Sequence, residues 1–352
     1  MSERGWRSRL DERRSPHVLA VGPLRGAAAA ALRGFIEAEA ADFPALPWVW
    51  HALKARGKLL TDEGVFAWGL LPPLVTSASG GDPLVALPLG TALECFVAAA
   101  DVLDDVEDAD ASDALWVSSG AATAINVATY LLQLTPIALG QLAERGVPLG
   151  KVVDIMRLLA ASGARACVGQ QRDLDAVGLQ PLDEEEYLAT ISLKSASLVS
   201  AACRAAAVLA VDDQNVSDLY AEFGLNVGLA MQIGNDVVGA SRESGNRDDL
   251  VRGKLTLPVI FALEYASPAA REEALALLST REEGKLAADE VGRLRRLIAS
   301  TGALEYCQLM ADVHWERALE CLRWAGCPED SDLVLLVAEM RGGSVGKDVD
   351  AS

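Results

Sequence analysis

The sequence has little of the residues that build several common kinds of site. Its 3 histidines lie far apart, which excludes a histidine-based metal site. Its 6 cysteines are scattered and no two form a CxxC pair, which argues against a zinc site. Basic residues are also scarce, because 31 Lys and Arg face 50 Asp and Glu. The resulting net charge of −19 argues against nucleic acid as a partner, since binding it requires a basic surface.

The chain also lacks the segments that mark export or a division into domains. No apolar run reaches the length of a membrane-spanning helix without a charge, a proline or a glycine. Residues 1–16 are rich in arginine and carry no apolar core of a secretory signal. We therefore expect no transmembrane segment, reduced thiols and a cytoplasmic location. No Gly/Ser/Pro-rich linker occurs, so we expect one domain at 17–341, between a disordered arm at 1–16 and a flexible tail at 342–352.

The sequence is rich in apolar residues with helical spacing. Hydrophobic residues make up 51% of the chain, whereas aromatic residues make up only 5%. The helical period persists nearly throughout, and no stretch reads as a β-hairpin. We therefore predict an all-α bundle with its site in the bundle core. Helices expected at 84–108, 149–175 and 213–243 carry the motifs described below, and Pro72-Pro73 are expected to interrupt an apolar helix at 65–75.

The first notable stretch is acidic and ends an apolar helix. It reads Asp104-Asp105-Val106-Glu107-Asp108 and follows the apolar residues 95–100. Carboxylates at the end of a buried helix are costly unless something binds them. Asp104 and Asp108 are four residues apart and share one helical face, where their hard oxygens suit Mg²⁺. The alternative interpretation is a solvated helix end that runs into a polar loop.

A second oxygen-rich helix end follows much later in the chain. It begins with Gln232-Ile233-Gly234-Asn235-Asp236 and continues to Glu243. Asn235, Gly239 and Glu243 are spaced by four, so they also share one face. Two such helix ends that face each other across a cavity would hold a cluster of Mg²⁺ ions, for which a diphosphate is the natural ligand.

Several motifs in a fixed order give the chain a family resemblance. They are DDxxD at 104–108, GQxxDL at 169–174, Lys194-Ser195, the segment 232–236, and DLxxGKxTLP at 249–258. In this order they resemble the isoprenyl diphosphate synthases, or polyprenyl synthetases. The resemblance covers most of residues 20–341. It implies the class I isoprenoid synthase fold, a single-domain helical bundle with a central apolar cavity.

The resemblance also implies a reaction and roles for individual residues. An allylic prenyl diphosphate of about fifteen to twenty carbons is ionised in a homodimeric enzyme, while a cluster of three Mg²⁺ ions and the lysines stabilise the departing pyrophosphate. An apolar pocket keeps water from the carbocation. The roles implied are metal binding for Asp104, Asp105, Asp108, Asn235, Gly239 and Glu243; diphosphate binding for Lys194, Arg242 and Lys254; the substrate pocket for Phe96, Ala99, Ala100, Gln170 and Gln232; and support for Asp173 and Asp236.

Some of these residues have an ordinary structural interpretation as well. Lys194 is compatible with a surface lysine whose stem lies along apolar surface. Arg242 is compatible with a solvent-facing neighbour of Glu243. Gln170 and Asp173 are compatible with hydrogen bonds on a helix surface. The small residues at 98–100 would either leave room for a long prenyl chain above Phe96 or serve close helix packing.

The chain departs from the chain-elongating members of this family at the second substrate. Those members bind isopentenyl diphosphate through a GKRxRP-like motif and through an Arg-Arg-Gly that follows DDxxD. Here the first place reads Arg56-Gly57-Lys58-Leu59-Leu60, and no Lys or Arg occurs from 59 to 144. A second diphosphate would lack its usual charge-assisted partners, with Arg56 and Lys58 supplying one side only.

The second metal motif also departs from the elongating pattern. Asn235 and Gly239 stand where elongating members carry aspartates, a pattern that resembles terpene cyclases. Because Gly239 has no side chain, a water would have to replace that ligand.

Three activities are compatible with these features. We favour a terpene cyclase on a prenyltransferase-like scaffold, which acts on one allylic substrate. The first alternative is a chain-elongating isoprenyl diphosphate synthase with an unusual second site, supported by the motif order and the GKxTLP segment. The second is a prenyltransferase for a peptide or another acceptor, because the run from Leu115-Trp116 through 124–129 resembles pheromone-peptide prenyltransferases. A non-catalytic partner subunit is disfavoured by the metal motifs.

Overall fold

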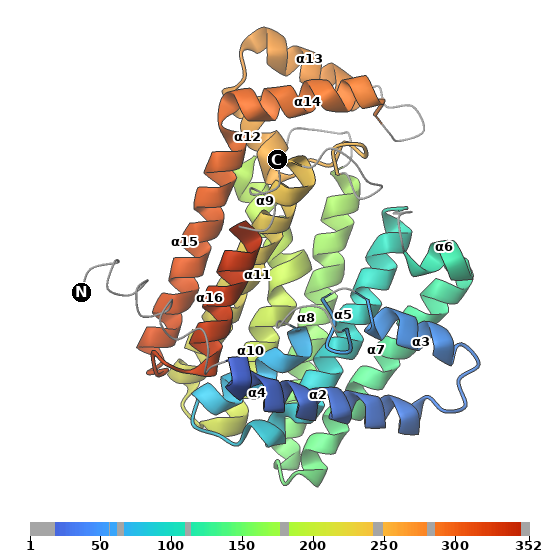
Figure 1. The fold of residues 1–352 in the computed structure, drawn as a ribbon, viewed down its shortest axis with the longest axis vertical. Helices are drawn as coiled ribbons and strands as arrows, with labels where there is room; N and C mark the ends of the chain where they lie inside the picture. Colours follow the sequence, from blue (N-terminus) through green and yellow to red (C-terminus); the bar gives the residue numbers. More distant parts are fainter. Residues whose placement is uncertain are drawn as a thin grey trace. The chain divides into compact units, whose positions relative to one another are not determined.

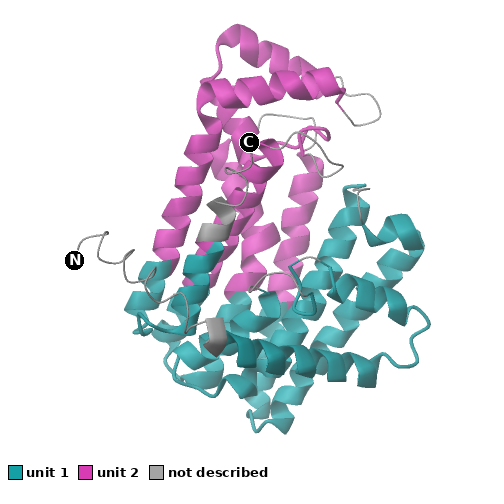
Figure 2. Ribbon diagram, viewed as in Figure 1, with its two compact units in different colours: residues 1–159, 201–221, 319–340 teal, residues 160–200, 222–318, 341–352 magenta. Residues whose placement is uncertain are grey.

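The computed structural model describes residues 18–55, 57–61, 67–109, 114–176, 183–241, 249–279 and 286–345. Within these residues every regular element is a helix, which confirms the all-α prediction (Figure 1). The predicted arm at 1–16 lies outside the described residues. The chain divides into two compact units, each of which is described by itself (Figure 2).

Unit 1 comprises residues 1–159, 201–221 and 319–340. Its own elements are α2 (Val18–Glu39), α3 (Leu46–Leu53), η1 (Trp68–Leu70), α4 (Leu71–Ala78), η2 (Pro83–Ala86), α5 (Leu87–Glu107), α6 (Leu115–Ser119) and α7 (Ala121–Glu144). The most extensive helix–helix contact in this unit joins α5 to α7 (Figure 1).

Composition explains why α5 and α7 form the centre of unit 1. Residues 87–100 of α5 are apolar or small apart from Glu94, so most of its surface is buried, including Leu89 and Leu93. No charged residue occurs in α7 before Glu144, and one of its faces buries Leu131 and its apolar neighbours. The acidic end of α5 is therefore held on a rigid, packed helix.

The structure corrects the prediction for Pro72-Pro73. These prolines do not interrupt a helix; they open α4, directly after the short η1 turn. A proline at the first helical positions is tolerated because the N–H that it lacks would have no partner within the helix. The same preference places Pro47 at the start of α3.

Unit 2 comprises residues 160–200, 222–318 and 341–352. Its own elements are α9 (Glu184–Ile191), the π-helical turn η3 (Ser192–Ala196), α12 (Leu257–Tyr265), α13 (Pro268–Ser279) and α14 (Ala288–Thr301). Longer helices contribute residues to both units: α8 (Leu149–Asp175), α10 (Ser197–Ala210), α11 (Gln214–Ser241), α15 (Ala303–Trp324) and α16 (Asp332–Val345). Helix α16 thus extends beyond Arg341, into the segment that we predicted as a flexible tail.

Local signals fix the start of α9 and the end of α14. The Asp183 side chain accepts from the Glu186 backbone N–H at 2.8 Å, and Glu186 reaches back to the Asp183 N–H, which is a capping box. Gly302 ends α14 in the left-handed conformation, with φ of 74°. Inside unit 2, Tyr187, Ile233 and Leu257 belong to one hydrophobic cluster.

Three segments are long and apolar enough to cross a membrane by length and composition alone. They are Pro83–Glu107, Ala121–Glu144 and Glu184–Ala210. Between 44% and 67% of their apolar windows is buried inside the structure. The expected absence of a transmembrane segment therefore stays a prediction.

Candidate active site

The DDxxD carboxylates occupy the last turn of α5, in unit 1. Asp104 and Asp105 lie within the helix, and Asp108 is the C-cap, whose backbone N–H donates to the Asp104 carbonyl at 2.8 Å. The chain leaves the helix at Ala109, which has a φ of 53°. All three carboxylate side chains are half-buried. They lie at the negative end of the helix dipole, so a bound cation would offset the cost of holding them there.

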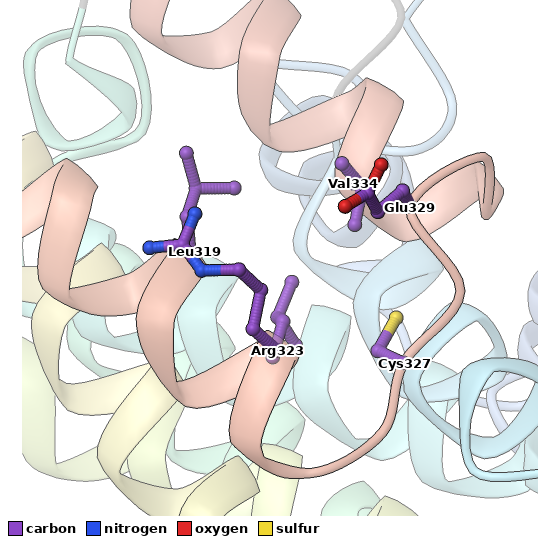
Figure 3. A pocket seen from close by; sticks show the side chains of 6 residues that line it. Leu319, Arg323, Cys327, Glu329 and Val334 are labelled. Atoms are coloured by element: carbon purple, nitrogen blue, oxygen red, sulfur yellow. The ribbon is translucent and has the colours of Figure 1, made fainter. Parts of the chain in front are cut away.

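The predicted pocket residues of α5 differ in exposure. Ala99 is fully buried, whereas Phe96 and Ala100 are half-buried. A surface pocket of unit 1, with about 270 Å³ of empty space, lies elsewhere and is lined by Leu319, Leu322, Arg323, Cys327, Glu329 and Val334 (Figure 3). None of the predicted pocket residues lines it, so their role stays a prediction.

Lys58 is buried rather than extended into solvent. Its ammonium forms an ion pair with the carboxylate of Asp101, one turn before the DDxxD motif. The loop that carries Lys58 is fastened by Glu94, which is fully buried and accepts from the Leu59 N–H at 3.2 Å and the Gly69 N–H at 2.7 Å. Burial raises the pKa of Glu94. Arg56, the other basic residue considered for this place, lies outside the described residues.

In unit 2, Lys194 lies on the π-helical turn η3. Its Nζ donates to Oδ2 of Asp173 on α8 at 2.6 Å, so these two predicted site residues meet. Glycines allow the backbones to approach: a Cβ at Gly169 would lie 2.3 Å from the Lys194 nitrogen, and one at Gly228 would lie 2.6 Å from Cα of Ala196. Such π-helical turns are frequent at functional sites. The close packing holds the turn that presents Lys194.

A chain of hydrogen bonds joins η3, α11 and α9. Ser195 Oγ donates to Oε1 of Gln232 at 2.9 Å. The Gln232 amide donates to Oδ1 of Asp236 at 2.9 Å, and the Tyr187 hydroxyl donates to Oδ2 of the same carboxylate at 2.5 Å. Burial, followed by the nearby charge of Asp236, raises the pKa of Tyr187 well above its ordinary value, so the hydroxyl stays protonated. Asp236 thus holds Tyr187 and Gln232 inside unit 2, and its supporting role in the reaction stays a prediction.

Asn235 and Asp236, which are consecutive on α11, differ in exposure. Asn235 is exposed, whereas Asp236 is buried, and burial raises the pKa of Asp236 to about 7. One turn further on, Gly239 faces the carboxylate of Asp249, whose Oδ2 lies 2.8 Å from the position of an ideal Cβ at the glycine. Arg242 and Glu243 were predicted to bind diphosphate and metal, and they lie outside the described residues.

Two further predicted residues are half-buried in unit 2. Gln170 follows the closely packed Gly169 on α8, and Lys254 follows the turn that starts at Asp249. The Lys254 backbone N–H donates to the Asp249 carbonyl at 3.0 Å, which fixes where this lysine leaves the turn. Their contacts with a substrate remain predictions.

The chemistry of the oxygen donors fits Mg²⁺. No three His, Cys, Asp or Glu side chains in the described part of the chain gather closely enough to hold a metal by themselves. Mg²⁺ does not require such a group, because it binds through one or two carboxylates, waters and substrate phosphates. In unit 1, Asp104 and Asp108 present hard oxygens of this kind. In unit 2, Asn235 presents an amide oxygen, and a carboxylate lies beside Gly239. The number of ions stays a prediction.

Sequence reasoning missed three residues that shape these sites. Glu94 did carry a signal, since it is the one charge within the apolar part of α5 before Asp101. Asp101 and Tyr187 carried none, because their partners are distant in sequence: Asp101 meets Lys58, and Tyr187 meets Asp236.

Comparisons with known proteins identify the class. The polyprenyl synthetase family model matches residues 69–293. A geranylgeranyl diphosphate synthase of Mycobacterium tuberculosis is 30% identical over 287 residues, which is 79% of each chain. A short chain isoprenyl diphosphate synthase of Methanothermobacter thermautotrophicus is 29% identical over 77% of this chain and 83% of its own. The crystal structure of a polyprenyl synthetase from Streptomyces coelicolor A3(2) has the same fold, with a TM-score of 0.77, 24% identity and coverage of 92% and 99%.

The helical fold and the ordered motifs therefore define a class I isoprenoid synthase. The chain belongs to the polyprenyl synthetase family, as its motifs predicted, and is an enzyme of the prenyltransferase type. The comparisons favour the elongating alternative over the terpene cyclase that we favoured from the sequence.

Proposed function

We propose that this protein is a Mg²⁺-dependent, chain-elongating isoprenyl diphosphate synthase, which joins an allylic diphosphate to isopentenyl diphosphate. The observation that carries its diphosphate chemistry is the Lys194 site, where a lysine on a glycine-packed π-helical turn lies beside Asp173 and a network that reaches the second metal motif. Relatives whose names are short chain isoprenyl diphosphate synthase and geranylgeranyl diphosphate synthase support the same reaction.

Positively charged groups would stabilise the pyrophosphate that leaves the allylic substrate. Ionisation of the allylic substrate leaves a pyrophosphate whose negative charge Lys194 and Lys254 would stabilise. Bound Mg²⁺ would supply further positive charge, and the residues that would hold it are Asp104 and Asp108 in unit 1 and Asn235 in unit 2. Lys194 is poised for this because its ammonium already pairs with a carboxylate, Asp173, that an incoming phosphate would replace or join.

A terpene cyclase is the second candidate, and particular observations favour it. No Lys or Arg occurs from 59 to 144, and Lys58, directly before that stretch, is already engaged by Asp101. Asn235 and Gly239 follow the cyclase pattern in the second metal motif. An enzyme with one diphosphate substrate requires no second set of basic residues.

Site variants test the assignment directly. Asp104→Ala and Asn235→Ala should each abolish Mg²⁺-dependent pyrophosphate release from allylic diphosphates. The exposed Asp289→Asn, which lies away from the motifs on α14, should leave it unchanged. Release that survives both site changes would refute the site, whereas release that needs no isopentenyl diphosphate would refute elongation and favour the cyclase.

We also propose that the protein is a homodimer that associates through α7. The exposed face of this helix carries Ile125 and Ile137, which are 45% and 46% exposed, and α7 has no charge before Glu144. A second copy of a chain with net charge −19 approaches best where charge is absent. Ile125→Asp combined with Ile137→Asp should yield monomers by sedimentation, and Leu309→Asp, a similarly exposed position on α15, should not. Unchanged sedimentation of the α7 variant would refute this surface.

We also propose a cytoplasmic location, because the cysteine thiols are not paired in disulfides. All 6 cysteines are free, and most are buried, which suits a reducing cytoplasm.

A further inference from the structure

The second metal motif has a gap at Gly239, and another segment of the chain fills it. Gly239 lies one helical turn after Asn235 on α11, where a motif ligand would otherwise project. The Asp249 carboxylate occupies that space: an ideal Cβ on Gly239 would lie 2.8 Å from Oδ2 and 3.6 Å from Cγ of Asp249. A side chain at position 239 would therefore collide with this carboxylate.

The turn that carries Asp249 has defined local geometry. The Lys254 N–H donates to the Asp249 carbonyl, and the Gly253 N–H donates to the Leu250 carbonyl, each at 3.0 Å. Gly253 adopts the left-handed conformation, with φ of 61°, which a side chain would strain. Leu250 is fully buried in a hydrophobic cluster of unit 2. The carboxylate is thus placed against α11 by its own anchored turn.

The acidic side chains near Gly239 take different roles. Asp236 is turned inward and is committed to Tyr187 and Gln232, so it is poorly placed to serve as a ligand on the outer side of α11. Asn235 is exposed and offers one neutral oxygen. Asp249 adds a carboxylate one turn further along the same helix face. An amide oxygen and a carboxylate oxygen at this spacing are hard donors of the kind that Mg²⁺ binds together with phosphates and waters.

We propose that Asp249 supplies the Mg²⁺-binding carboxylate at the place that Gly239 leaves open, so that a carboxylate, rather than the water we predicted, completes the motif. This inference rests on the proposed function only in assuming that Mg²⁺ and a diphosphate bind at this end of α11. In the proposed site the glycine is required, because only a residue without a side chain admits the carboxylate from position 249.

The test measures binding of magnesium pyrophosphate to the full-length protein by calorimetry, which does not depend on prenyl transfer. Asp249→Asn keeps the shape of the side chain and should weaken binding by about tenfold or more, since even the outer-shell partners of metal ligands are typically worth about 10–100-fold in affinity. Gly239→Asp alone should also weaken binding, because two carboxylates would compete for one space. The double variant Gly239→Asp/Asp249→Gly returns one carboxylate to the site and should bind within about threefold of the wild type, since additivity fails for residues in contact.

The control variant changes a carboxylate outside the proposed site. Asp289→Asn removes an exposed carboxylate of α14 and should bind magnesium pyrophosphate as the wild type does. Wild-type affinity in Asp249→Asn, or failure of the wild type to bind, would overturn the inference. Should Gly239→Asp or the double variant fail to fold, Asp249→Asn and its control still decide the question. Wild-type binding without any elongated product would instead refute the proposed function and leave the ligand assignment standing.

Discussion

Replacement of Asp236 by asparagine should change how the stability of the protein depends on pH. Burial is the main cause that raises the pKa of this carboxyl from 3.8 to about 7, the Tyr187 and Gln232 hydrogen bonds oppose the rise, and the nearby charge of Asp249 adds to it. Between these two pKa values the folded state binds a proton that the unfolded state has released. The contribution of Asp236 to stability is therefore lost as the pH rises towards 7.

The size of the effect follows from the linkage relation. With pKa values of 3.8 unfolded and about 7 folded, the destabilisation by Asp236 grows from roughly 2 kcal/mol at pH 5 to roughly 4 kcal/mol at pH 8. Asparagine has no charge to bury and keeps the shape of the side chain. Relative to the wild type, Asp236→Asn should therefore gain about 2–3 kcal/mol between pH 5 and pH 8.

Denaturant unfolding of both proteins at pH 5 and pH 8, without Mg²⁺, measures this difference. The wild type and Asp236→Asn share all their other acidic groups, so the titration of those groups cancels in the difference between their free energies of unfolding. Asp236→Asn should also bind magnesium pyrophosphate almost as well as the wild type, because Asp236 holds Tyr187 and Gln232 rather than a metal. An identical pH dependence in the two proteins would refute the buried-carboxyl reasoning, and a large loss of binding would make Asp236 a ligand.

Further predictions concern the residues that hold the two sites. Tyr187→Phe should lower the free energy of unfolding by about 1–3 kcal/mol in a urea titration, because the buried Asp236 loses a donor, and should leave the Mg²⁺ concentration needed for half-maximal pyrophosphate release almost unchanged. Tyr306→Phe, whose bond is to the half-buried Glu184, is the control and should cost less; a loss of stability no larger than that of the control would contradict the buried network. Gly169→Ala should lower the rate of that release by about tenfold or more, because its Cβ would lie 2.3 Å from the Lys194 nitrogen and displace the π-helical turn; a rate equal to that of the wild type would show that the turn tolerates the shift. Glu94→Gln should reduce the free energy of unfolding by about 1–3 kcal/mol in a urea titration, since one of two buried backbone N–H groups loses its acceptor. An unchanged unfolding midpoint would show that these two hydrogen bonds of Glu94 do not stabilise the fold.

Local sequence signals predicted most of the helices correctly. The helix at Leu149–Asp175 has the predicted bounds, and α5 ends one residue before the predicted residue 108, because apolar spacing and flanking turn residues act locally. The prolines at 72–73 were misjudged, since a proline signals either the interruption or the start of a helix and only the neighbouring turn decides between them.

The details of the site depended on contacts between distant residues. Nothing in the helical pattern around Lys194 distinguishes a π-helical turn from an α-helix, because the turn is packed against Gly169 and Gly228, on other helices. Asp249 was recognised only as part of a motif, and its approach to Gly239 is a tertiary contact. The pairing of Lys58 with Asp101 is of the same kind, and it bears on the choice between one and two diphosphate substrates.

Product analysis tests the central claim most directly. The full chain would be incubated with Mg²⁺ and allylic diphosphates of different lengths, each with and without isopentenyl diphosphate. Longer prenyl diphosphates that form only when isopentenyl diphosphate is present are the predicted result. A hydrocarbon or terpene alcohol that forms from an allylic diphosphate alone would contradict chain elongation and establish the cyclase.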